Sequence, residues 1–129
     1  TVSNYGVVGF IQDAAEYALK LGSSACISVA APFERRRTLA LEILKDFPQI
    51  HVTPPQGTMY LMLDIRSTGL NGEAFANALL EERKIAVMPG ESFGAAAAGH
   101  IRVAMTIEDS LFSKALTDLC DFASTLALK

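Results

Sequence analysis

AAGHIRVAM, residues 97–105, places one arginine between two branched apolar residues. Side chains alternate between the two faces of a β-strand, so Ile101, Val103 and Met105 share one face of the strand predicted here. Arg102 then points to the opposite face. The pattern predicts a sheet with two different sides: an apolar side that packs against helices, and a side on which Arg102 meets water or a cleft.

Apolar residues recur at helical spacing in four segments outside this strand and predict four helices. Pro32 suits the first position of a helix, so we expect the second helix to start there, after a polar linker at residues 23–24. On the last helix, the positions expected to face the core are Leu111, Ala115, Leu119 and Phe122. The predicted helices cover residues 9–21, 32–46, 73–82 and 108–126.

Three more segments, residues 51–52, 59–65 and 85–88, have the character of strands. Residues 59–65 are almost continuously apolar, which is typical of a strand buried on both faces. Residues 89–99 begin with Pro-Gly and are predicted to form a long loop. These elements predict an α+β fold, in which a small, mostly antiparallel sheet is covered on one face by helices.

The composition narrows the class of protein. The chain has 129 residues, of which 50% are hydrophobic, and this is the size of a single domain. A formal net charge of −3 argues against nucleic acid as a partner. No apolar run approaches the ~20 residues that span a bilayer, so no membrane partner is expected.

The cysteines and the first residues add two expectations. Cys26 and Cys120 show no Cys-x-x-Cys spacing and no histidine cluster, which predicts neither a metal site nor a disulfide framework and favours the reducing cytoplasm. The chain opens with Thr-Val-Ser-Asn rather than methionine. We therefore expect a fragment of a longer protein.

Arg102 is open to two interpretations. It is either a surface charge, alone or paired with a carboxylate, or a residue that recognises a ligand. A guanidinium presents a planar fork of N–H donors that matches a carboxylate, and it stays charged at any working pH. A strand also holds such a side chain more rigidly than a loop does.

Other polar groups give weaker signals. The loop at residues 89–99 borders whatever Arg102 faces, with a flexible connection as the alternative interpretation, and it lacks the lysine and hydroxyl residue of a phosphate-binding loop. His100 shares a face with Arg102, but no partner for a catalytic base is placed beside it, so we expect a satisfied or exposed histidine. The basic run at residues 35–37 has acidic neighbours and is predicted to be a solvated helix face.

Five segments, read in order, resemble the C-terminal part of the class I/II aminotransferases, which are pyridoxal-phosphate enzymes of the aspartate aminotransferase fold. The segments are FIQDAAEYAL, RRRTLALEIL, PPQGTMYLMLDIR, FANALLEERKIAVMPGESFG and GHIRVAM. Their combination is far more specific than any one of them, and it covers nearly the whole chain. Within the family, DIRSTGL and GESFGAAAAGHIR resemble the arginine–pyruvate transaminase subgroup.

The resemblance implies roles for particular residues. Arg102 would bind the α-carboxylate of the amino-acid or keto-acid substrate. Of the two interpretations of Arg102, the resemblance therefore favours ligand recognition over a surface charge. The loop residues that would line the cleft are Ser92, Phe93 and Gly94. Residues 1–31 would be the end of the large domain and a linker, and residues 32–129 would be the small domain.

The resemblance also implies what this chain lacks. In such enzymes, pyridoxal 5'-phosphate is held by a lysine and an aspartate of the large domain, which precedes this stretch. We therefore expect no catalytic and no cofactor-binding residue here, and a chain that alone neither binds the cofactor tightly nor transaminates. The full-length enzyme would be a homodimer, with residues 3–6 near the active site of the neighbouring subunit.

A second hypothesis comes from another class of protein. The chain could instead be a stand-alone, non-catalytic α+β domain that binds a small carboxylate or serves as an interaction domain. The two hypotheses differ in whether the isolated chain takes up amino or keto acids at micromolar affinity. The amino donor and the keto acceptor depend mostly on residues upstream and are not predicted from this stretch.

Overall fold

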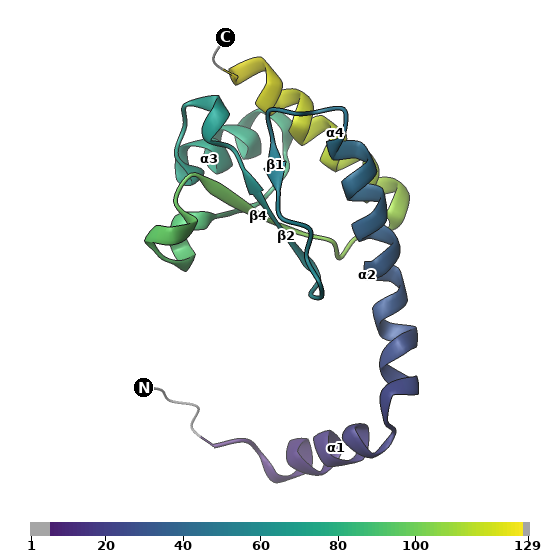
Figure 1. Ribbon diagram of the computed structural model, residues 1–129. Coiled ribbons are helices and arrows are strands. Elements are labelled where there is room, and N and C mark those ends of the chain that lie inside the picture. Colours follow the sequence, from purple (N-terminus) through teal and green to yellow (C-terminus); the bar gives the residue numbers. More distant parts are fainter. Residues whose placement is uncertain (1–5, 128–129) are drawn as a thin grey trace. The chain divides into compact units, whose positions relative to one another are not determined.

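Figure 1 shows the protein as a computed structural model that describes residues 6–127. The chain divides into two units, Thr1–Pro32 and Phe33–Lys129, which we describe separately. Of residues 3–6, for which a position near a second subunit is implied, residues 3–5 lie outside the described part. Among the described residues, no helix has the length and apolar character needed to cross a membrane.

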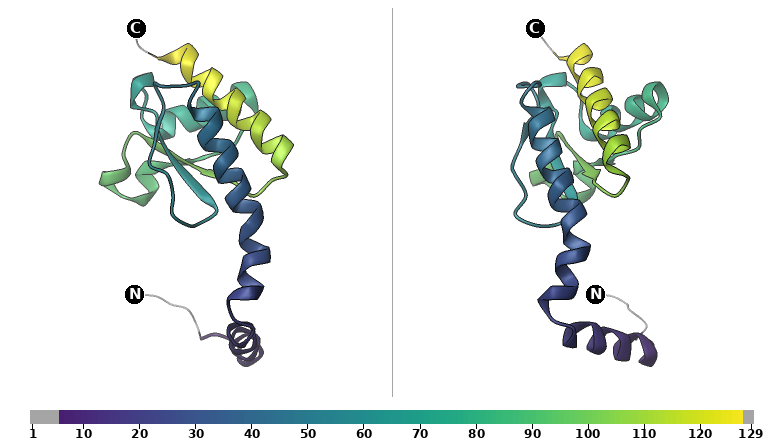
Figure 2. Two further views of the ribbon diagram at one scale, coloured as in Figure 1. Left: turned by 45° about the vertical axis from the view of Figure 1, so that its right-hand side comes forward. Right: turned by 90° about the vertical axis from the view of Figure 1, so that its right-hand side faces the viewer.

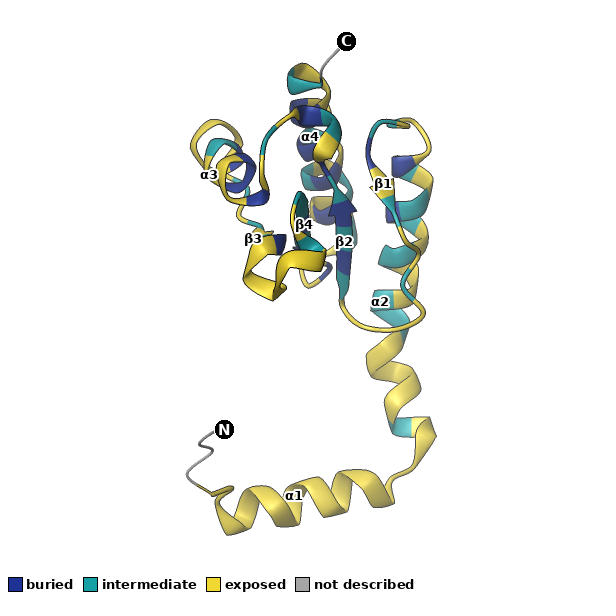
Figure 3. Ribbon diagram, turned by 60° about the vertical axis from the view of Figure 1, so that its left-hand side comes forward, coloured by how far each residue is buried: buried dark blue, intermediate teal, exposed yellow. Residues whose placement is uncertain are grey.

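The first unit consists of α1 (Gly9–Lys20) and the first part of α2 (Ser23–Leu44). The prediction of α1 is confirmed, and within this unit all of its residues are exposed (Figure 3). The prediction of a linker at residues 23–24 and of a helix start at Pro32 was wrong, because α2 begins at Ser23 and Pro32 lies inside it. Proline removes one backbone hydrogen bond from a helix, and α2 continues through Pro32 with that one bond missing.

The second unit contains a four-stranded antiparallel sheet in the order β1-β2-β4-β3. Its register places Leu61 opposite Val103 and Leu63 opposite Ile101, so the apolar residues of the two inner strands share one face. The predicted strand at residues 85–88 was placed too early in the chain, because only its last residue pairs with β4. The strands are β1 (His51–Val52), β2 (Tyr60–Asp64), β3 (Met88–Pro89) and β4 (His100–Ala104).

Three helical segments cover this face: the second part of α2, α3 (Gly72–Arg83) and α4 (Asp109–Leu126). Both views of Figure 2 show α2 and α4 side by side. Phe75 of α3 and Phe122 of α4 pack at the centre, with ring centroids 5.5 Å apart. This arrangement confirms the predicted α+β fold with a small antiparallel sheet.

Two predictions about burial need correction. Strand β2 is buried on one face only, because Leu61 and Leu63 are in the core while Tyr60 and Met62 are half-buried on the other face. On α4, Leu111 is 57% exposed and Phe112 faces the core in its place. Helical spacing fits either residue, and the larger aromatic ring occupies the space between the helices.

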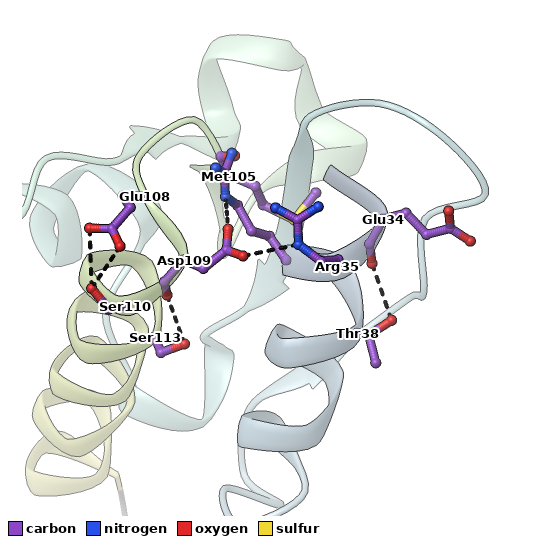
Figure 4. Close-up of polar contacts among 9 residues, drawn as sticks. Glu34, Arg35, Thr38, Met105, Glu108, Asp109, Ser110 and Ser113 are labelled. Atoms are coloured by element: carbon purple, nitrogen blue, oxygen red, sulfur yellow. Dashed lines mark hydrogen bonds and ion pairs between the residues drawn. The ribbon is translucent and has the colours of Figure 1, made fainter. Parts of the chain in front are cut away.

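The basic run at residues 35–37 is not a uniformly solvated helix face. Arg36 donates from Nε to Asp109 of α4 at 2.7 Å and from Nη1 to the Met105 carbonyl oxygen at 3.0 Å, and its side chain is only 13% exposed. Arg35 donates to the other oxygen of the same carboxylate at 3.1 Å (Figure 4). The arginines hold the pKa of Asp109 below its usual range, Arg36 most strongly. Spacing along α2 could not reveal this, because the acid comes from another helix.

Strand β2 ends in a second ion pair. Asp64 accepts hydrogen bonds from the backbone N–H of Arg66 at 3.0 Å and from its guanidinium, with Nη2 at 2.5 Å. The side-chain hydrogen bonds from Arg66 are the main reason that the pKa of Asp64 is lowered to about 2. The carboxylate is 12% exposed, whereas the Arg66 side chain is 69% exposed.

We expect Leu116→Ala to lower the free energy of unfolding by about 2–5 kcal/mol, because Leu116 is 2% exposed and its loss leaves a cavity. Leu111→Ala is the matched control on the same helix and should change it by less than about 0.5 kcal/mol. Urea unfolding followed by circular dichroism measures both. Equal losses for the two variants would contradict the orientation of α4.

The Asp64 pair predicts a pH-dependent contribution to stability. A pKa lowered on folding stabilises the protein above the unfolded value of 3.8, and this contribution is lost as the pH falls through about 2. The shift corresponds to roughly 2.5 kcal/mol at most, and solvent around Arg66 reduces the expected value to about 1 kcal/mol. In urea unfolding, Asp64→Asn should cost this amount at pH 6 and progressively less as the pH falls from about 4 toward 2; a constant difference would exclude the linkage.

Candidate functional site

Arg102 lies at the middle of β4, an inner strand of the sheet. Met62 of β2 is opposite it on one side and Met88 of β3 on the other. Backbone pairing on both sides fixes the position of its Cα atom. Ile101 and Val103 are buried, so the side chain of Arg102 is on the face that the helices do not cover, as the alternation predicts.

Two aromatic rings lie against the guanidinium. Its Cζ atom is 4.1 Å from the ring centroid of Tyr60 on β2 and 4.6 Å from that of Phe93. Both distances are within the range in which a cation is attracted to the face of a ring. Aromatic rings also displace water from a guanidinium without using its N–H donors, so those donors remain available to an acceptor.

Two carboxylates of the neighbouring segments β2 and η2 have other partners. Asp64 binds Arg66, and Glu91 accepts hydrogen bonds from backbone N–H groups. Within residues 6–127, no hydrogen bond and no ion pair involves the guanidinium of Arg102. The charge of Arg102 is therefore uncompensated, and the fork of N–H donors can accept a planar anion from outside the chain.

The predicted loop at residues 89–99 contains two short turns of 3-10 helix, η2 (Gly90–Phe93) and η3 (Ala95–Ala97). Of the three loop residues predicted to line a cleft, Phe93 of η2 is the one that contacts Arg102. Ser92 is exposed on the same turn, and Gly94 joins the two turns with φ +108°, a conformation that favours glycine. The structure thus brings one of the three predicted loop residues onto the guanidinium, and the other two flank that residue in the chain.

Two residues of this site had no role in the sequence-based hypothesis. Tyr60 lies two residues before Met62 on β2, and Met62 is opposite Arg102. The sequence could place Tyr60 on the face of Arg102 only if the pairing register of the two strands were already known. Glu91 binds two glycine N–H groups that are distant from it in the sequence, at Gly72 and Gly99. No spacing in the sequence around Glu91 indicates that it binds these two N–H groups.

His100 shares the face of Arg102 but has no arrangement of a catalytic base. Its Nδ1 atom is 3.0 Å from the Ala98 carbonyl oxygen, and it lies opposite Asp64 in the sheet. The ring is half-buried and has this backbone partner. This agrees with the expectation of a satisfied histidine.

The lysines of residues 6–127 do not fit the covalent attachment of pyridoxal phosphate. An amine that forms a Schiff base needs a site that lowers its pKa and shields it from water. Lys20 and Lys45 instead pair with a glutamate of their own helical segment, Lys84 donates to the Glu81 carbonyl, and Lys114 is exposed on α4. The described residues also contain no cluster of three or more histidine, cysteine or acidic side chains that could hold a metal ion.

Comparison with known proteins gives a consistent result. The family model for aminotransferase class I and II matches residues 13–119. The chain is 43% identical over 103 residues to the arginine–pyruvate transaminase AruH of Pseudomonas aeruginosa, which is 80% of this chain and 26% of that protein. The chain spans about a quarter of the length of the curated relatives that it matches.

Solved structures show the same fold. The aromatic aminotransferase of Pyrococcus horikoshii superposes with a TM-score of 0.68 at 27% identity, over 74% of this chain and 25% of that one. A putative aminotransferase of Clostridium difficile, solved with pyridoxal phosphate bound, gives a TM-score of 0.71 at 26% identity, over 79% of this chain and 27% of that one. Because the family model matches most of the sequence and the fold agrees, the chain belongs to the class I and II aminotransferases.

Proposed function

We propose that this chain is the C-terminal part of a pyridoxal-phosphate-dependent aminotransferase, and that Arg102 binds the α-carboxylate of its amino-acid and 2-keto-acid substrates. The observation that carries the proposal is the guanidinium of Arg102. It lies against the rings of Tyr60 and Phe93 and has no acidic partner among residues 6–127. Family membership supports the class of reaction, and the geometry around the guanidinium supports the role of Arg102 in it.

The chemistry of a carboxylate favours this role. Two parallel N–H···O bonds from a guanidinium fix both the position and the plane of the carboxylate, which a lysine cannot do. The inner strand β4 holds Arg102 on a rigid element, and the flanking rings reduce the water that competes for its donors. A substrate held in this way has one orientation for its Cα–H bond, and orientation accounts for a large part of enzymatic rate enhancement.

The remaining parts of the enzyme belong to the proposal as well. Residues 1–31 are the end of the large domain and a linker, and residues 32–129 are the small domain. When bound in the full-length protein, pyridoxal phosphate supplies the aldehyde that takes up the amino group. We place its lysine upstream of this chain, and we expect a cytoplasmic homodimer. The similarity to AruH makes arginine and pyruvate the first substrates to test.

In the full-length enzyme, Arg102→Lys should lower kcat/KM by at least tenfold, because losing a bidentate charged pair costs roughly 2–5 kcal/mol. Arg35→Lys is the matched control, since Arg35 is 59% exposed on α2 and is not part of this site. Steady-state kinetics with arginine and pyruvate measures both variants. An unchanged kcat/KM for Arg102→Lys would refute the assignment.

The isolated chain should not take up substrate or cofactor. We expect no lysine-bound absorbance band after addition of pyridoxal phosphate, because the described lysines are exposed to water and two of them pair with glutamates. Equilibrium dialysis should show no micromolar binding of arginine or pyruvate. Micromolar binding would instead favour a stand-alone carboxylate-binding domain.

A further inference from the structure

We propose that Glu91 is a positioning residue for Arg102: its carboxylate attaches the segment 90–98 to α3 and to the start of β4, and so keeps Phe93 on the guanidinium. The proposal rests on the function proposed for Arg102 and names a second residue on which that site depends. The carboxylate of Glu91 joins three parts of the fold: η2, the start of α3 and the start of β4.

The contacts of Glu91 are with backbone N–H groups. Its Oε1 atom accepts a hydrogen bond from Gly72, the first residue of α3, at 2.9 Å and another from Gly99, which precedes β4, at 3.1 Å. These bonds, Gly99 first and then Gly72, lower the pKa of Glu91. The carboxylate is therefore ionised at neutral pH, and the positive end of the α3 dipole favours a negative charge there.

The backbone around this carboxylate leaves no room for other side chains. A Cβ atom at Gly72 would overlap the second carboxylate oxygen of Glu91 and would lie 2.6 Å from the His100 carbonyl oxygen. A Cβ atom at Gly90 would overlap the Ala97 carbonyl and lie 2.7 Å from the same His100 oxygen. Glycine at both positions lets α3, η2 and β4 approach closely enough for one carboxylate to join them.

The carboxylate and the ring that contacts Arg102 belong to the same short turn. Glu91 and Phe93 are both in η2, and the N–H of Gly94 donates to the Glu91 carbonyl at 3.2 Å, which closes that turn. Such local bonds keep the shape of η2 but do not attach it to the rest of the domain. Phe93 is itself 47% exposed, so its own packing holds it only in part. The position of Phe93 therefore depends on the anchor at Glu91.

Loss of the anchor should act on substrate binding more than on the chemical step. Without it, η2 moves as a unit and Phe93 leaves the guanidinium, which becomes more hydrated and less fixed in orientation. Arg102 remains in place on β4 and can still pair with a carboxylate. We expect KM for the amino-acid substrate to rise by roughly tenfold, less than the about hundredfold that a misplaced reacting group can cost, while kcat changes little.

The first experiment uses NMR on the chain and does not depend on catalysis. Aromatic rings over the guanidinium should shift the Arg102 Nε–H and Cδ–H₂ resonances upfield, and Phe93→Leu shows how much of this shift Phe93 causes. Glu91→Ala should reproduce at least half of the Phe93→Leu change. Arg102 resonances that stay at their wild-type positions in Glu91→Ala would overturn the proposal.

Three variants separate the anchor from a simple effect of charge or folding. Glu91→Gln keeps an acceptor oxygen at the same distance and should retain most of the upfield shift, whereas the shorter Glu91→Asp should lose it. Glu73→Gln removes an exposed acid from the first turn of α3 and should leave the Arg102 resonances unchanged. An equal change in Glu73→Gln would overturn the proposal. Far-UV circular dichroism confirms that each variant is folded.

The second experiment measures KM and kcat of Glu91→Ala and Glu91→Gln in the full-length enzyme. A raised KM in Glu91→Ala that Glu91→Gln largely restores supports the positioning role, and an unchanged KM contradicts it. The function proposed for Arg102 fails separately, if Arg102→Lys keeps its kcat/KM while the NMR series behaves as expected.

Discussion

The two-sided character of β4 is the constraint on which the rest of this domain depends. Ile101 and Val103 contribute to the core between the sheet and the helices, and they pair with Leu63 and Leu61 on the neighbouring strand. A register slip by one residue would expose these side chains and drive the charge of Arg102 into the core, which is costly on both accounts. Burial of Ile101 and Val103 on one face of β4 therefore places Arg102 on the opposite face.

An arginine recognises a substrate only if its own chain does not neutralise it. In this domain three acids have other partners: Asp64 binds Arg66, Asp109 binds two arginines of α2, and Glu91 binds backbone N–H groups. The partners of Arg102 are rings, which attract the cation but accept no bidentate pair. Among the described residues, the guanidinium of Arg102 is thus left without an acidic partner, while ion pairs elsewhere join parts of the fold.

Close backbone approach links the fold to this site. At Gly72 and Gly90 a side chain would collide with carbonyl oxygens, so the start of α3, the turn η2 and the start of β4 meet at a point that only glycine permits. The carboxylate of Glu91 lies where these three segments meet and accepts hydrogen bonds from the backbone of α3 and of the residue before β4. The stability of the fold and the substrate recognition that we propose for Arg102 would consequently depend on the same few contacts, and a change at either glycine is expected to affect both.

The sequence by itself determined the elements and the family. Period-2 alternation placed Arg102 opposite Ile101, and helical spacing located α3 and α4 to within two residues, because both signals are local. The tertiary structure alone decided that Phe112 rather than Leu111 enters the core and that the Arg36 side chain is largely buried. It alone brought Tyr60 and Phe93 to Arg102, and Glu91 to the backbone N–H groups of Gly72 and Gly99. These contacts join segments far apart in the chain, and their geometry depends on register and packing, which spacing along one segment does not encode.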